Sequence, residues 1–97
     1  MATFVSLINW TEQGIKNFRD TPKRAKAFRE LVEKNGGRVV SLHWTLGEYD
    51  LVAITEAPDD ETFTAIGLIL GSLGNVRTAT LRAFDEAAIE RIIAKTS

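Results

Sequence analysis

Two strand-like segments, residues 38–46 and 49–56, are separated only by the dipeptide Gly47-Glu48. Both segments have the composition of β-strands. Because glycine tolerates a positive φ, it suits the first central position of a two-residue type II′ turn. The sequence therefore predicts a tight antiparallel hairpin at this point, and the length of its turn determines which residues face one another across the two strands.

The rest of the chain alternates between strand and helix patterns. Residues 3–10 are β-branched and aromatic and predict a strand, whereas apolar side chains from Ile15 to Val32 recur every three or four residues, as on one face of a helix. Pro22 should divide that helix and begin its second segment, because proline lacks the backbone donor. The remaining predicted elements are a helix from Pro58 to Gly74, a strand over 76–84 and a helix over 85–95.

The predicted order is β-α-β-β-α-β with an extra C-terminal helix. It belongs to the α+β class and matches the ferredoxin-like arrangement, in which a four-stranded antiparallel sheet carries two helices on one face. A chain of 97 residues has room for one such domain, spanning 1–97, with a single core. Gly67 and Gly71, four residues apart on the second long helix, predict that this helix approaches the sheet closely.

The predicted strands are apolar on both faces. The first strand places Val5 and Leu7 on one face, and Phe4 and Ile8 on the other. A sheet with one face in water would instead alternate apolar and polar residues. Because two helices on one side cannot cover both faces, we expect the second face to meet another subunit, which predicts a homodimer formed sheet to sheet.

Composition argues against several classes of function. The net charge is −1, from 12 basic and 13 acidic residues, so no global field attracts nucleic acid or an anionic membrane. The chain has no cysteine and one histidine, which argues against thiolate chemistry and against the usual metal sites, so we expect neither a metal nor a cofactor. No signal-peptide pattern and no stretch long enough to span a bilayer is visible, and we expect a cytoplasmic protein.

Three blocks of sequence resemble the GYD-domain family. They are Leu46-Gly47-Glu48-Tyr49-Asp50, then Glu56-Ala57-Pro58-Asp59-Asp60, and finally Gly74-Asn75-Val76-Arg77-Thr78 continuing into Thr80-Leu81-Arg82-Ala83-Phe84. The resemblance covers nearly the whole chain and implies a single GYD domain over 1–97. It also implies the dimeric α/β-barrel superfamily, in which two ferredoxin-like sheets face each other. That superfamily includes monooxygenases, isomerases, haem enzymes and ligand-sensing modules, so the fold leaves the reaction open.

The hairpin brings two candidate catalytic residues, His43 and Asp50, onto one face. A two-residue turn pairs Leu46 with Tyr49, Thr45 with Asp50 and Trp44 with Leu51. One residue further along, it pairs His43 with Val52. Diagonal neighbours on a sheet face lie roughly 7–8 Å apart, so His43 and Asp50 could form an imidazole–carboxylate pair that acts as a general base. Alternatively, His43 packs against a neighbour and Asp50 accepts donors at the hairpin.

Four further side chains are candidates for ligand binding, namely Tyr49, Arg82, Trp44 and Trp10. Tyr49 lies on the face opposite to Asp50 and could donate a hydrogen bond at a pocket edge or serve as a core ring. Arg82 shares a strand face with threonines and would suit an anionic ligand, or equally a salt bridge across the dimer. Trp10 and Trp44 could clamp a flat ligand or simply pack at strand ends.

Together these features predict a small-molecule-binding or sensing module that forms a homodimer or a higher oligomer, without nucleic-acid or membrane partners. The alternative is a cofactorless enzyme, monooxygenase- or isomerase-like, with His43 or Asp50 as the base and with Arg82 or Tyr49 stabilising negative charge. A third interpretation is that side chains fill the interior and the dimer face itself is the function.

Overall fold

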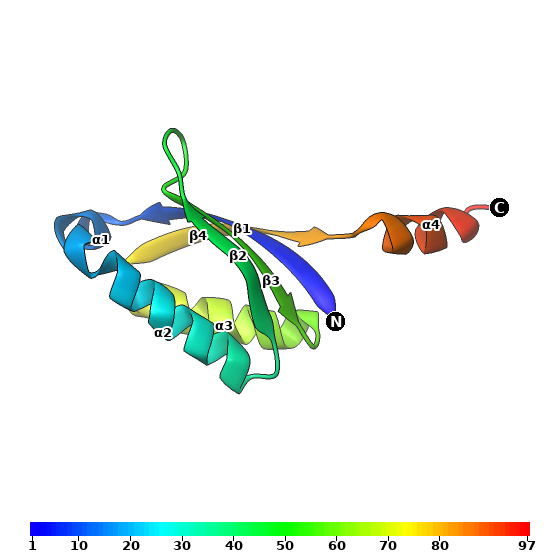
Figure 1. Cartoon of the computed structure of the whole chain (residues 1–97), viewed down its shortest axis with the longest axis horizontal. Helices are drawn as coiled ribbons and strands as arrows, with labels where there is room; N and C mark the ends of the chain where they lie inside the picture. The colour runs from blue at the N-terminus through cyan, green and yellow to red at the C-terminus, as the bar shows by residue number, and fades with distance from the viewer.

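The computed structural model describes all of residues 1–97, and its elements follow the predicted order. The four strands form one antiparallel sheet in the order β2-β3-β1-β4, so the fold is α+β and consistent with a ferredoxin-like arrangement (Figure 1). None of the helices has the length and apolar character needed to cross a membrane. The elements are β1 Ala2–Trp10, α1 Glu12–Lys16, the 3-10 turn η1 Phe18–Asp20, α2 Thr21–Lys34, β2 Arg38–Trp44, β3 Leu51–Ala57, α3 Asp60–Ser72, β4 Val76–Ala83 and α4 Glu86–Ala94.

Helices α2 and α3 cover one face of the sheet, and the core lies beneath them (Figure 1). Along β1 and β3, buried residues alternate with half-exposed ones, as the predicted faces require. Phe63 of α3 stacks on Phe4 of β1, with ring centroids 4.4 Å apart. Val32 of α2 and Ile66 of α3 are almost completely buried beside this pair. The core is therefore built from one sheet face and the inward side of two helices.

The opposite sheet face carries no helix. Val5, Leu7, Val52 and Ile54 lie on it and are half-exposed. Leu81 of β4 pairs with Val5 on the same face and is 54% exposed. The two-sided apolar character seen in the sequence is thus present in the folded chain, and one chain alone leaves one side uncovered.

The first helical region is divided, as Pro22 predicts. The Thr11 side chain caps α1 by accepting a hydrogen bond from the N–H of Gly14 at 3.1 Å. Pro22 lies in the first turn of α2, where its missing N–H costs no hydrogen bond. Helix α1 is also fastened to the loop between α3 and β4, because the Thr11 N–H donates to the carbonyl of Asn75 at 3.0 Å.

Asp59 caps α3. Its Oδ1 accepts from the N–H of Thr62 at 2.7 Å, and hydrogen bonds from Thr62, chiefly from that N–H, hold the pKa of Asp59 below its ordinary value. Because the pKa is lower in the folded state, this cap stabilises the fold above the unfolded-state pKa. The contribution is lost as the pH falls through the folded-state pKa. Asp85 caps α4 in the same way, accepting from the N–H of Ala88 at 2.8 Å.

The hairpin has the predicted register, with Trp44 opposite Leu51 and His43 opposite Val52. The predicted two-residue turn is wrong. Beyond the last regular pair the Thr45 N–H still donates to the carbonyl of Asp50 at 2.8 Å, and the residues between these two form a longer loop that projects from the sheet (Figure 1).

Hydrogen bonding to β1 explains the longer loop. The N–H of Asp50 donates to the carbonyl of Ile8 at 2.9 Å, so this residue is held by β1 before the chain enters β3. Gly47 does adopt a positive φ of 120° at the loop tip, and its neighbour Leu46 is fully exposed. Leu46 therefore does not pack on a sheet face opposite Tyr49.

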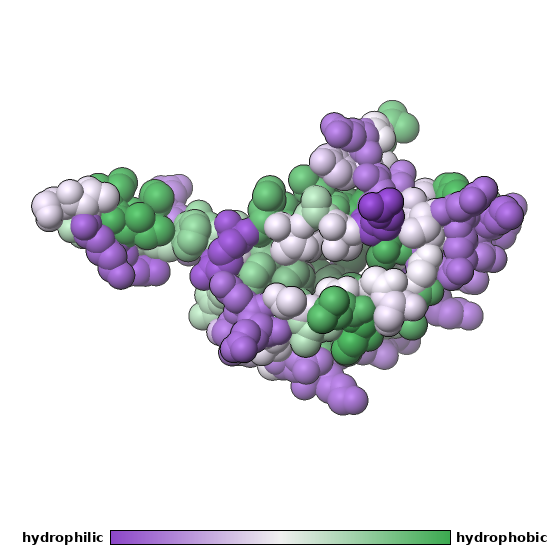
Figure 2. Space-filling model, turned by 180° about the vertical axis from the view of Figure 1, so that it is seen from behind, coloured by the Kyte–Doolittle hydropathy of each residue, from purple (hydrophilic) through white to green (hydrophobic).

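Helix α4 projects from the body of the molecule. Figure 1 shows it beyond the end of β4, away from the sheet and the other helices. It buries none of its own residues, and Ile89, Ile92 and Ile93 are exposed. Figure 2 shows hydrophobic atoms gathered on this projecting part of the molecule. The apolar side of α4 is therefore not covered within one chain, although a helix this short is only marginally stable in water by itself.

The predicted role of Gly67 and Gly71 is wrong. A Cβ at either position would meet nothing within 4 Å, so these glycines do not bring α3 close to the sheet. The close approach occurs instead at Gly14 in α1, where a Cβ would overlap the backbone oxygen of Asn75. The absence of a side chain at Gly14 thus allows α1 to pack on the loop between α3 and β4.

Alanine substitutions at Gly67 and at Gly14 should change the free energy of unfolding in opposite directions. Gly67→Ala should raise the free energy of unfolding by about 0.5–1 kcal/mol, because alanine loses less backbone entropy than glycine in a helix. Gly14→Ala should lower it by about 1–3 kcal/mol, because α1 must move away from the loop to make room. Urea denaturation followed by circular dichroism measures both values, and equal effects of the two substitutions would contradict the packing described here.

Candidate functional site

Asp50 joins the hairpin to the end of β1. Its Oδ2 accepts a hydrogen bond from the backbone N–H of Trp10 at 2.9 Å, while its own N–H donates to Ile8. The β1–β3 ladder ends at the pair of Ile8 and Leu51, so the carboxylate satisfies a β1 donor just beyond it. The structure thus gives this carboxylate the role of a hairpin acceptor.

His43 is not joined to Asp50. It lies exposed on the uncovered sheet face opposite Val52, whereas the Asp50 carboxylate is bonded to Trp10. The predicted imidazole–carboxylate pair is therefore not formed in this structure, because the hairpin loop turns Asp50 toward β1. No group of three or more histidine, aspartate or glutamate side chains is placed to hold a metal ion.

Arg82 lies on the helix-covered face, opposite Phe4. Its Nε donates to Oδ1 of Asp60 at 3.2 Å, and its Nη1 donates to the carbonyl of Ala83 at 2.7 Å. The guanidinium also lies 4.8 Å from the centroid of the Phe84 ring. Within one chain, its salt bridge is therefore to Asp60 in the first turn of α3.

The two tryptophans are the last residues of strands that run in the same direction, Trp10 of β1 and Trp44 of β2, and so lie toward the same end of the sheet. The indole Nε1 of Trp44 donates to Oγ1 of Thr21, at the start of α2, at 3.0 Å. Tyr49 is half-buried in the hairpin loop, where its carbonyl accepts from the Thr45 hydroxyl. Of these aromatic residues, only Trp10 lines the groove that this end of the molecule contains.

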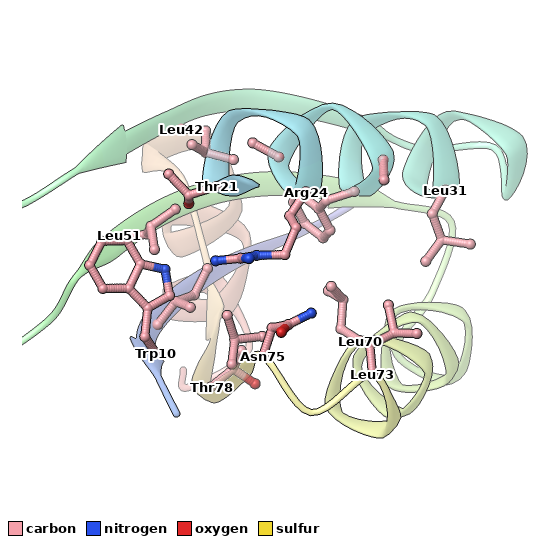
Figure 3. Close-up of a pocket in the computed structure, with 15 residues that line it drawn as sticks. Trp10, Thr21, Arg24, Leu31, Leu42, Leu51, Leu70, Leu73, Asn75 and Thr78 are labelled. Carbon is pink, nitrogen blue, oxygen red and sulfur yellow. The ribbon is translucent and has the colours of Figure 1, made fainter. Parts of the chain in front are cut away.

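That groove opens between α2, α3 and the covered face of the sheet (Figure 3). Its volume is about 310 Å³, near the lower end of the range for ligand pockets, roughly 300–1,000 Å³. Of its 15 lining residues, 11 are hydrophobic. Small side chains on α2, Ala25 and Ala27, leave space where larger ones would have closed the core.

Polar groups gather at one end of the groove. Figure 3 shows the Arg24 side chain reaching across it, near Asn75, with the indole nitrogen of Trp10 turned inward. The Arg24 guanidinium donates to two carbonyls, those of Asn17 at 3.0 Å and Gly14 at 3.2 Å. The indole Nε1 of Trp10 is buried and has no hydrogen-bond partner. Leucines line the other end, namely Leu31, Leu70 and Leu73.

Arg24 and Asn75 line the groove but were not predicted from the sequence as candidate site residues. Arg24 lies four residues before Phe28, at the edge of the apolar stripe of α2. A charged residue at this position was the sequence pattern that could have predicted a polar group beside the core. It was hidden among the other basic residues of the same helix, which form a solvated face. Asn75 directly follows the predicted end of the helix at Gly74, and its neighbours across the fold cannot be predicted from local pattern.

The GYD domain family matches residues 4–93. The chain belongs to the GYD domain family. A protein of Thermus thermophilus, named glutamine synthetase and cystathionine beta-lyase binding protein, is 38% identical over 88 residues, covering 90% of this chain and 93% of that protein. The crystal structure of TTHA0845, also from Thermus thermophilus, is similar with a TM-score of 0.54 and 29% identity, covering 88% of this chain and 95% of that one.

The match confirms the family resemblance predicted from the three sequence blocks. It begins at Phe4 in β1 and ends at Ile93 in α4. The projecting helix α4 is therefore part of the GYD domain and not an appendage outside it.

Substitution of Asp50 tests its structural role. Asp50→Ala should lower the free energy of unfolding by about 1–3 kcal/mol, because the Trp10 N–H loses its acceptor. Asp50→Asn, which keeps an acceptor oxygen, should have a smaller effect. Glu48→Ala removes an exposed carboxylate from the same loop and should change stability by less than about 0.5 kcal/mol. Chemical denaturation of the three variants measures these values, and equal losses for Asp50→Ala and Glu48→Ala would contradict the assignment.

Proposed function

We propose that this GYD-domain protein is a homodimeric binding module whose groove holds a small, partly apolar molecule. The observation that carries the proposal is the groove of about 310 Å³ that α2 and α3 leave open beside a closed core. Its mostly hydrophobic lining favours apolar ligand atoms, because burying apolar surface contributes about 25 cal/mol per Å². The few polar groups at one end would orient such a ligand. In this proposal the protein is cytoplasmic, and ligand binding requires no cofactor.

Two exposed apolar surfaces support the homodimer. One is the uncovered sheet face with Val5, Leu7, Val52, Ile54 and Leu81. The other is the isoleucine side of α4. Contiguous apolar surface of this kind marks interaction sites, and packing of two uncovered sheet faces would produce the dimeric α/β barrel that the resemblance implies.

The geometry gives less support to a cofactorless enzyme. Asp50 is engaged by the backbone of Trp10, and His43 lies on the other side of the sheet from the groove. A general base must lie within hydrogen-bond reach of the proton that it removes. Neither residue lines the groove, so a ligand held there would not meet them.

Native mass spectrometry of the purified protein tests the groove. We expect a species with the mass of two chains and a retained small molecule. Ala25→Phe should abolish retention, because the larger ring fills the groove. Ala65→Phe, at an exposed position of α3 outside the lining, should retain the molecule. Detection of the bare protein alone, for the wild type and both variants, would count against ligand binding.

A charge on the uncovered face tests the dimer. Leu81 is already 54% exposed in one chain, so Leu81→Glu should leave the protomer folded while placing two desolvated carboxylates in the dimer interface. Light scattering should then report half the wild-type mass. Leu68→Glu, at a 71% exposed position on α3, is the matched control and should keep that mass. A wild-type protein with the mass of one chain would exclude the homodimer.

Binding to another protein is a second candidate function. It is favoured by the name of the Thermus relative, which describes binding to glutamine synthetase and cystathionine beta-lyase. Leu46 at the hairpin tip and Ile93 on α4 offer exposed apolar contacts for such a partner. Mixing the protein separately with purified glutamine synthetase and with purified cystathionine beta-lyase, each from the organism that encodes this chain, would test it. A complex that persists with Ala25→Phe supports protein binding independent of the groove, and no complex with either enzyme counts against it.

A further inference from the structure

We propose that the groove binds a small apolar monocarboxylate, with the carboxylate at the end formed by Arg24 and Trp10. This inference rests on the proposed binding function and names the ligand class. It follows from three properties of the groove, namely an arginine without an anionic partner, a buried donor without an acceptor, and walls that are otherwise apolar.

Arg24 is the cation of the site. It is half-buried and lines the groove, and its hydrogen bonds go to the neutral carbonyls of Gly14 in α1 and of Asn17 just beyond it. The salt bridges of the protein lie elsewhere, between Arg38 and Glu56 and between Arg82 and Asp60. No aspartate or glutamate lines the groove. A guanidinium in such surroundings attracts an anion, and its planar fork matches a carboxylate in particular.

Trp10 supplies a second donor. Its backbone N–H is already bonded to Asp50, but its indole Nε1–H is buried without an acceptor. Buried donors in folded proteins are nearly always paired, so an orphan donor that faces a cavity indicates a missing acceptor. The other buried polar atom without a partner, Oγ1 of Thr55, is not part of the groove lining. The buried polar atom of the groove that lacks a partner is therefore a donor, which requires a hydrogen-bond acceptor.

The other lining residues of the groove indicate the charge and polarity of the rest of the ligand. Arg24 is the single charged residue of the lining, and beyond Asn75 the groove continues between leucines. One guanidinium balances one negative charge, whereas a phosphate ester near pH 7 carries more charge and needs more donors. A polar ligand body would lose its hydrogen bonds to water without replacing them. These properties favour a singly charged carboxylate on a hydrocarbon body.

Calorimetric titration of the purified protein with three probes of equal chain length tests the inference. Octanoate should bind at least about 10-fold more tightly than 1-octanol, and more tightly than octyl phosphate. Arg24→Met should remove most of the preference for octanoate over octanol. Trp10→Phe, which keeps a ring but removes the donor, should weaken octanoate about 3- to 10-fold and leave octanol unchanged. Lys23→Met, an exposed neighbour outside the lining, is the matched control and should bind as wild type does.

The outcomes separate this inference from the function on which it rests. Equal binding of octanoate and octanol, both abolished by Ala25→Phe, would overturn the carboxylate class while leaving a binding groove. Tighter binding of octyl phosphate would overturn it in favour of a phosphate. Binding of none of the probes would overturn both the inference and the proposed groove function. If Arg24→Met fails to fold, because this arginine also anchors α1, the Trp10→Phe comparison decides alone.

Discussion

Two helices cover only one face of a sheet that is apolar on both faces, and most of the structure follows from this mismatch. The covered face closes the core through the Phe4–Phe63 stack and the buried side chains of Val32 and Ile66. The other face keeps Leu81 and its neighbours in contact with water. Because apolar surface of this extent is costly to leave exposed, the same constraint that builds the protomer also favours an assembly of more than one chain.

The groove depends on the short helix α1, although α1 contributes no side chain to it. Packing of Gly14 against Asn75 holds α1 on the loop between α3 and β4, and the Gly14 carbonyl helps to orient the guanidinium of Arg24. The hairpin has a comparable effect on the neighbouring wall, because Asp50 binds the backbone of Trp10 and leaves its indole free to face the cavity. The hairpin thus supports one wall of the groove.

Local pattern was sufficient for much of the fold. The alternation along β1 and β3, the division of the first helix at Pro22 and the pairing of His43 with Val52 could all be predicted, because each depends on residues that are close in sequence or on strand period. The turn could not, because the bond from the Asp50 N–H to Ile8 joins residues far apart in the chain. For the same reason Gly67 was assigned the close approach that belongs to Gly14.

The sequence by itself therefore determined the order of the elements, the register of the hairpin and the family, because residue periodicity and short motifs predict all three. Only the tertiary structure decided which polar groups share a cavity. The groove is lined by polar side chains from a helix, a loop and a strand that are distant in sequence, namely Arg24, Asn75 and Trp10. They lie close together because of the way in which α2 and α3 pack on the sheet. His43 and Asp50, close in sequence and predicted as a pair, are separated because a long-range backbone hydrogen bond turns one of them away.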